Sequence, residues 1–150
     1  MTDGPAFEHL DPDECRRLLR GRDFGRVCLS VEGTTEIMLA GYVVEGDTIY
    51  FRTSAFGRLA RQVETRPVTL QTDDMGPRQQ ASWSVTFTGP AHRVTASHTL
   101  ASLWTPVRPA AWDDGVASLW IGLEPKDIRG QRAVNRPEGT LPVGVRRAGP

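Results

Sequence analysis

The sequence predicts a mainly β (α+β) fold, a small antiparallel barrel of about six to eight strands with two or three short flanking helices. Short segments with period-2 alternation recur along the chain, separated by turns that contain Gly, Asp and Pro. Helical patterns are few and short. The 150 residues suit one domain, and a chain of this length buries roughly 70% of its unfolded surface, enough for a core without disulfides or metals.

The first expected element is a helix that begins after Asp11. Asp11 can serve as the N-cap, Pro12 suits the first helical position, and Glu14 completes a capping-box pattern. The helix runs to about residue 20, and Gly21 is a natural stop. We expect residues 1–9 to form a loose arm before it.

Alternating apolar segments predict the strands. In the first of them, Val27, Leu29 and Val31 share one face. The expected strands cover residues 26–31, 36–44, 47–51, 68–73, 82–88, 91–95, 116–123 and 128–133, and the two further helices cover about 55–64 and 97–104. The domain thus spans residues 10–133, and residues 134–150, rich in Pro, Gly and Arg, form a mobile tail.

Composition and motifs exclude several classes of function. Eighteen basic residues balance eighteen acidic ones, so the chain lacks the excess positive charge of a general nucleic-acid binder. No signal peptide opens the chain and no apolar run reaches the length of a membrane span, which favours a cytoplasmic protein that does not bind membranes. The two cysteines form no Cys-x-x-Cys pair, so no metal site is predicted. Ser-hydrolase, P-loop and Rossmann motifs are absent.

The strand that ends at Phe51 continues through Arg52, Thr53 and Ser54 into a predicted helix that contains Arg58. A helix start offers free N–H groups and partial positive charge, and the hydroxyls and guanidinium groups add donors for an anion. The segment therefore suits a phosphate site. A capped helix with solvated arginines is the alternative, and the spacing alone leaves both open.

Small residues and tryptophans mark a second candidate region. Ala40 and Gly41 follow Leu39 in mid-strand, where glycine weakens packing unless another group approaches closely. Trp83 and Trp120 also lie in predicted strands. A strand tryptophan packs in a core, at a subunit interface or beside a planar ligand, and the first two are the usual cases.

The order of these motifs resembles that of the pyridoxamine-phosphate-oxidase-like group, the flavin-binding split β-barrels. The similarity covers about residues 10–133. It rests on the segments LDPDECRRLL, GRVCLSV, MLAGYVVEGDTIYFRTSAFGRLA, PVTLQTDD, WSVTFTGPAHRV and LEPKDIRGQR. The resemblance implies that the predicted barrel is a split β-barrel.

The resemblance also implies a binding site for FMN. Relatives often carry Ser-Lys where this chain has Gly57 and Arg58, and proline with a polar residue where it has Ala40 and Gly41. The implied cofactor-binding residues are Arg52, Thr53, Ser54 and Arg58 at the phosphate, the backbone of Leu39, Ala40 and Gly41 at the ring edge, and Trp83 and Ser84 along the ring.

The resemblance also implies a homodimer with two equivalent binding sites between the subunits. True pyridoxamine phosphate oxidases end in an Arg-x-His pair, which this C-terminus lacks. The sequence therefore favours a flavin-dependent oxidoreductase with another small-molecule substrate. No residue stands out as a catalytic acid or base.

Two other functions stay open. A deazaflavin-dependent reductase of the same fold would need extra arginines for a longer acidic tail, and Arg61, Arg66, Arg146 and Arg147 could serve. A non-catalytic module would bind a flavin, a haem-like or other ligand, or only a partner protein. A further alternative is that cofactor binding has been lost and only the dimeric fold remains. Turnover with a reduced nicotinamide or reduced flavin would distinguish an enzyme from such a module.

Overall fold

The computed structural model describes residues 7–54, 57–75, 82–103 and 119–134. The strands within these residues are β1 (Phe7–His9), β2 (Phe24–Val31), β3 (Thr34–Glu45), β4 (Thr48–Thr53), β5 (Val68–Asp74), β6 (Trp83–Gly89), β7 (Ala91–Arg93), β8 (Leu119–Leu123) and β9 (Asp127–Ala133), and the helices are α1 (Pro12–Arg20), α2 (Arg58–Gln62) and α3 (Ser97–Leu103). The predicted mainly β fold with short helices is confirmed. The predicted tail beyond residue 134 lies outside the described residues.

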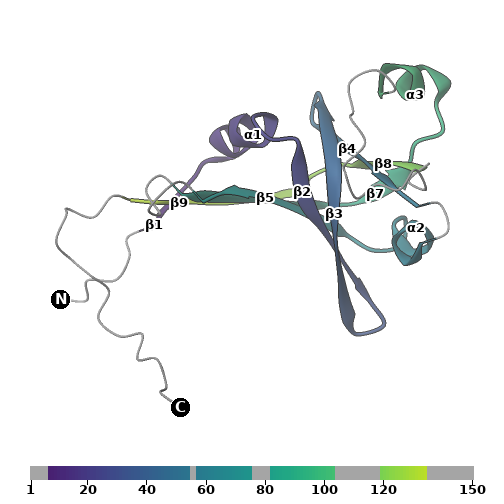
Figure 1. The fold of residues 1–150 in the computed structure, drawn as a ribbon, viewed down its shortest axis with the longest axis horizontal. Helices are drawn as coiled ribbons and strands as arrows, with labels where there is room; N and C mark the ends of the chain where they lie inside the picture. The colour runs from purple at the N-terminus through teal and green to yellow at the C-terminus, as the bar shows by residue number, and fades with distance from the viewer. Residues whose placement is uncertain (1–6, 55–56, 76–81, 104–118, 135–150) are drawn as a thin grey trace, which may run out of the picture.

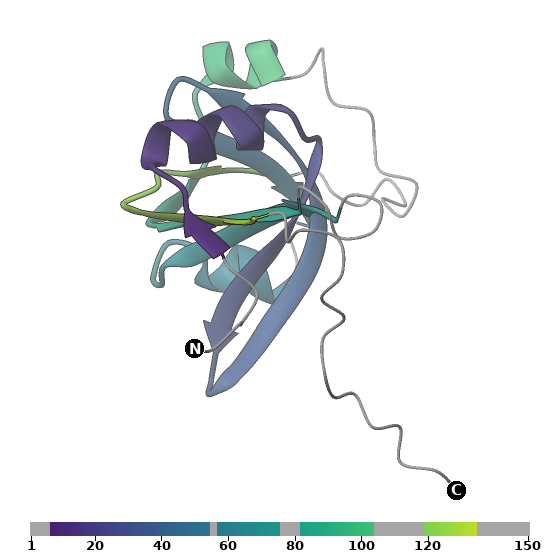
Figure 2. The same ribbon diagram turned by 90° about the vertical axis from the view of Figure 1, so that its left-hand side faces the viewer.

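The described strands form one antiparallel sheet in the order β1-β9-β6-β5-β2-β3-β4-β8-β7. Figures 1 and 2 show the sheet curving around its interior, and both α1 and α2 contribute buried residues to the core that it encloses. The long strand β3 joins the two halves of the barrel, because Thr34–Gly41 pair with β2 and Tyr42–Glu45 pair with β4. This change of partner along one strand turns the sheet.

The beginning of the chain departs from the prediction. Residues 7–9, expected in a loose arm, form β1, in which Phe7 pairs with Ala133 and His9 with Gln131. The edge of β9 offers unpaired backbone groups, and β1 satisfies them. Sequence alternation cannot detect a three-residue strand, since its pairing depends on a segment more than a hundred residues away.

Helix α1 begins as its capping signal predicts. The Asp11 carboxylate accepts a hydrogen bond of 2.9 Å from the backbone N–H of Glu14, and Gly21 ends the helix. The Glu14 side chain accepts hydrogen bonds from Arg17 at 2.6 Å and from Arg132 of β9 at 2.7 Å. Glu14 therefore ties α1 to the sheet.

The hydrogen bonds that Glu14 accepts from Arg17 and Arg132 stabilise the fold in a way that depends on pH. Its hydrogen bonds from Arg17 and then Arg132 lower the pKa of Glu14 from 4.5 to about 2. Because the folded-state pKa is lowered, the stabilisation is present above pH 4.5 and is lost as the pH falls toward 2. We expect the melting temperature of wild type to fall more steeply across this window than that of Glu14→Gln. Asp13→Asn removes a carboxylate that pairs with Arg16 but is itself 97% exposed; this variant is the control and should follow wild type.

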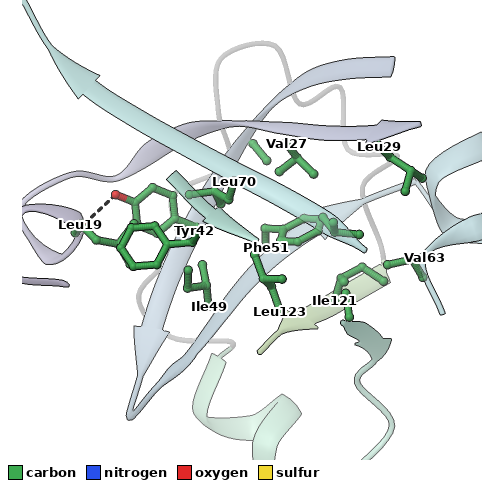
Figure 3. Close-up of a cluster of buried hydrophobic side chains, with 14 of the residues drawn as sticks. Leu19, Val27, Leu29, Tyr42, Ile49, Phe51, Val63, Leu70, Ile121 and Leu123 are labelled. Atoms are coloured by element: carbon green, nitrogen blue, oxygen red, sulfur yellow. Dashed lines mark hydrogen bonds between the residues drawn. The ribbon is translucent and has the colours of Figure 1, made fainter. Parts of the chain in front are cut away.

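The core fills the concave side of the sheet, here called the inner face. Figure 3 shows Phe51 at the centre of the apolar cluster, among residues from several strands. The Tyr42 hydroxyl donates a hydrogen bond of 2.6 Å to the carbonyl of Leu19, which satisfies this buried polar group and fixes α1 against β3. Burial raises the pKa of Tyr42.

A second, smaller apolar cluster lies on the opposite side of the sheet, the outer face. Val94, Leu103 and Trp120 are its buried members, and Val43 and Tyr50 pack against them. Helix α3 thus covers the outer face at β4 and β8. The outer face at β2 and β3 has no such cover among the described residues, and there Phe24, Ile37 and Leu39 are 40%, 65% and 50% exposed.

Candidate functional site

The strand registers place several predicted site residues in one row across the outer face. Ser84 of β6 lies opposite Asp73 of β5, and Phe24 of β2 lies opposite Gly41 of β3. Arg26 and Leu39 form the neighbouring pair on the same face. Side chains two residues apart on a strand share a face, so these positions project to one side of the sheet.

The outer face also carries Arg52. Tyr42 and Phe51 are paired, and both side chains lie in the core. Gly41 and Arg52 are their neighbours on β3 and β4, so they face the opposite side of the sheet, the outer face. The Arg52 guanidinium lies 5.7 Å from the centre of the Trp120 ring. Its Nε is buried and has no hydrogen-bond partner within the described part of the chain. Such a donor is costly to leave unpaired, so it suits a ligand oxygen.

Other predicted site residues point into the protein. Ala40 and Thr53 are 4% and 3% exposed, and the Thr53 hydroxyl contacts the Met38 sulfur at 3.9 Å. Trp83 packs against the inner core, with the Arg22 guanidinium 5.8 Å from its ring. Only the backbone of Ala40 and Thr53 is therefore left for contact with a ligand on the outer face. Trp83 and Ser84, which are adjacent in the sequence, face opposite sides of the sheet.

The predicted phosphate corner has a different geometry from the one expected. Helix α2 begins at Arg58, with Gly57 as its N-cap, and no side chain caps it. The half-buried Ser54 lies before this turn, and its carbonyl accepts a hydrogen bond of 3.2 Å from the Gly57 N–H. Ser54 therefore does not cap the helix, contrary to the simplest interpretation of the sequence.

Arg58 is held by a carboxylate. Its guanidinium donates a hydrogen bond of 2.8 Å to Glu36 of β3, and this pairing raises the pKa of Arg58. The pair is partly exposed, with 63% of the Arg58 side chain and 37% of the Glu36 side chain accessible to solvent. An exposed pair of this kind is weak, so a phosphate could compete with Glu36 for the arginine.

A cleft of about 310 Å³ opens beside β2, near the turn between α1 and β2. Phe24, Arg26, Leu39 and Asp73 are among its lining residues. The Arg26 guanidinium donates a hydrogen bond of 2.8 Å to the Asp73 carboxylate. The volume is at the lower end of the range for small-molecule sites, and the lining combines an apolar ring with fixed polar groups.

No metal centre accompanies this cleft: the described segments contain no group of three His, Cys, Asp or Glu side chains placed to hold an ion. Within the same segments, no helix is long and apolar enough to cross a membrane.

Comparison with known proteins gives the family. The sequence profile of the pyridoxamine 5'-phosphate oxidase family matches residues 11–132. The chain belongs to this family. A curated relative, the uncharacterised protein Rv0080 of Mycobacterium tuberculosis, is 28% identical over 130 residues, which cover 83% of this chain and 84% of the relative.

Solved structures agree with the family assignment. An FAD-binding protein from Mycobacterium smegmatis is 26% identical and superposes with a TM-score of 0.66, covering 85% of this chain and 98% of the other. An FAD-binding protein from Mesorhizobium loti is 17% identical with a TM-score of 0.71, covering 88% of this chain and all of the other. The predicted split barrel of the pyridoxamine 5'-phosphate oxidase family is thereby confirmed.

Sequence reasoning missed three residues of the cleft, Phe24, Arg26 and Asp73. One signal was available for Phe24, because alternation in FGRVCLSV places this aromatic ring on the same face as Arg26, opposite the apolar Val27 and Leu29. No sequence signal links Arg26 to Asp73, which is 47 residues away.

Proposed function

We propose that this chain binds a flavin on its outer face and serves as a flavin-dependent oxidoreductase for a small molecule. The observation that carries the proposal is the row of Ser84, Gly41 and Arg52, predicted separately, on the outer face of the sheet beside a cleft of about 310 Å³. The family membership of the chain supports it.

The residues present fit a flavin. The exposed Leu39 and Phe24 side chains offer apolar contact to a planar ring, and the buried Nε of Arg52 is a donor without a partner among the described residues. A bound flavin supplies the redox chemistry, and the protein binds and orients it. In this proposal Leu39 and the backbone at Gly41 hold the ring, while Arg52, Ser54 and Arg58 hold phosphate oxygens.

FMN and FAD share the ring and the first phosphate, so both suit these residues. FMN is the cofactor expected from the sequence, and the FAD-binding relative from Mycobacterium smegmatis makes FAD an equal candidate. The first experiment is an absorption spectrum of the purified protein, followed by titration with FMN, FAD, riboflavin and a deazaflavin coenzyme. Saturable binding of FMN or FAD supports the proposal. Binding of the deazaflavin alone would favour the reductase alternative. A protein that binds none of the four ligands would contradict the proposed flavin binding.

The role of Arg58 is tested by a pair of substitutions with opposite expectations. Arg58→Ala should weaken FMN binding by about 1.5–3 kcal/mol, because a charge-assisted hydrogen bond to phosphate is lost. Glu36→Gln should leave FMN binding equal or tighter, since it removes the carboxylate that holds Arg58 at 2.8 Å. Affinities are measured by fluorescence titration. Riboflavin, which lacks the phosphate, is the control ligand, and an equal loss for riboflavin would contradict the phosphate role.

We also propose that two copies of the chain pair through the uncovered outer face at β2 and β3. Phe24, Ile37 and Leu39 form an exposed apolar patch there, and such patches mark interaction surfaces. A two-fold dimer buries the same patch from both copies. Each flavin would then lie between the subunits, shielded from water.

Ile37→Glu should dissociate this dimer. Each buried isoleucine contributes about 1.5–3 kcal/mol, and the substitution removes that contribution twice while adding two charges. The dimer dissociation constant, measured by analytical ultracentrifugation, should rise on the order of a hundredfold or more. Val134→Glu, at an exposed apolar position after β9, is the control. An unchanged dimer in Ile37→Glu would place the interface elsewhere.

A further inference from the structure

Two buried N–H donors on neighbouring strands of the outer face lack an acceptor. Arg52 of β4 lies directly opposite Trp120 of β8, and its guanidinium is 5.7 Å from the centre of the Trp120 ring. Three buried side-chain polar atoms of the described chain have no hydrogen-bond partner, and two of them are Arg52 Nε and Trp120 Nε1. Buried donors are costly to leave unpaired. Donors on directly opposite residues can share one acceptor group.

Arg52 differs from the other half-buried arginines of the described chain. Arg16, Arg22 and Arg132 each pair with a carboxylate within 3.2 Å. No carboxylate of the described residues forms an ion pair with Arg52. A half-buried positive charge is stabilised by an opposite charge, so the missing acceptor is expected to be an anion.

The surroundings of the two donors favour a ligand with one negative charge. Val94 and Leu103 are buried beside Trp120, and Val43 packs against the same apolar cluster. In such surroundings one guanidinium balances one carboxylate, whereas a phosphate dianion would keep an uncompensated charge. The apolar side chains also complement a hydrocarbon body. A carboxylic acid with an apolar body therefore matches both the donors and their neighbours.

Helix α3 is the cover over these donors. It has seven residues, and its side chains Leu100 and Leu103 belong to the apolar cluster on the outer face. The described side-chain hydrogen bond from α3 to the sheet joins Ser102 to Glu45 of β3 and is 3.4 Å long. A short helix held by such contacts opens at a low free-energy cost. Its opening would admit a ligand to the two donors.

We propose that Arg52 Nε and Trp120 Nε1 bind the carboxylate of the small-molecule substrate, whose apolar body lies against the cluster under α3. This inference rests on the proposed flavin-dependent function and deepens it, because it names the substrate class as a carboxylic acid with an apolar body. One carboxylate oxygen accepts from the guanidinium and the other from the indole. The terminal N–H groups of Arg52 stay available for the flavin phosphate, since a guanidinium carries five N–H donors.

The indole N–H of Trp120 reports on the carboxylate directly by NMR, and Trp120→Phe identifies its resonance. Benzoate and hexanoate are the probes. At least one of them should move this resonance downfield with a saturable dependence on concentration, because a charge-assisted hydrogen bond forms. Benzamide and hexanamide have the same bodies without the charge, so they should bind at least about tenfold more weakly. The indole of Trp83, which packs against the inner core, should not move.

Two substitutions test the two donors separately. Trp120→Phe keeps an aromatic ring under α3 and removes the indole N–H, while Arg52→Gln removes the charge. Each should weaken binding of the carboxylate probe, measured by calorimetry, about tenfold or more. Arg61→Gln, at an exposed arginine of α2, is the matched control and should bind the probe like wild type. Thermal unfolding of each variant separates loss of fold from loss of binding.

The outcomes separate this inference from the proposed function. A saturable shift of the Trp120 indole that depends on Arg52 and on the charge of the probe supports the inference. An indole that neither carboxylate moves, or that the amides move equally, would overturn it. Weaker binding of FMN but not of riboflavin by Trp120→Phe would also overturn it, because the indole would then serve the flavin phosphate. Flavin titration of wild type tests the proposed function independently of these probes.

Discussion

Replacing Gly89 with alanine is expected to destabilise the protein by about 3 kcal/mol or more. Gly89 ends β6, and an added Cβ would overlap the backbone oxygen of Glu124 and lie 2.9 Å from its carbonyl carbon and 3.0 Å from the nitrogen of Lys126. The obstacle is backbone, which cannot rotate away as a side chain can. The same backbone donates hydrogen bonds of 2.9 Å to Thr88 and Pro90, so relief of the overlap would break them.

The free energy of unfolding from urea titration measures this effect. Gly21→Ala is the matched control, because the nearest atom to its added Cβ is at 3.5 Å and the position is exposed. We expect this control to change stability by no more than about 0.5 kcal/mol. A Gly89→Ala variant as stable as Gly21→Ala would contradict this close approach of the turn between β8 and β9 to the end of β6.

The second large effect is expected for Phe51→Ala, which should cost about 3–5 kcal/mol of unfolding free energy. Phe51 is fully buried and pairs with Tyr42 on one side and Ile121 on the other, so its ring joins both halves of the barrel. The rest of the sheet cannot collapse into the space, because three neighbouring strands hold their registers through backbone hydrogen bonds.

Phe7→Ala is the control for Phe51→Ala, since the same ring is removed from a side chain that is 53% exposed. Its cost should be below about 1 kcal/mol. Similar costs at the two positions would contradict the central place of Phe51 in the core. Arg52 follows Phe51 on β4, so loss of the Phe51 ring should also displace Arg52. If Arg52 contacts the flavin phosphate as proposed, the Phe51→Ala variant should therefore bind flavin more weakly.

Local sequence signals predicted the elements on which the site stands. The alternation of Val27, Leu29 and Val31 identified the buried face of β2, and all three are buried. The capping signal at Asp11 located the start of α1. These predictions succeed because they depend on contacts within a few residues or on the period of a single strand.

The same signals did not distinguish the two sides of the candidate site. Adjacent residues on a strand point to opposite faces, so the predicted sets Leu39–Gly41 and Arg52–Thr53 each divide between core and surface. The residue that reaches outward depends on which face the barrel buries. The curvature of the whole sheet decides that, and it put Ala40 and Thr53 inside.

By itself, the sequence determined the mainly β fold class, the first helix and the family resemblance, because periodicity and turn residues are local. The tertiary structure alone decided which groups meet: Phe24 on Gly41, Arg26 with Asp73, and Arg58 with Glu36. These contacts join strands or helices distant in the chain. Strand register and sheet curvature set them, and both arise from long-range backbone pairing, which no local pattern encodes.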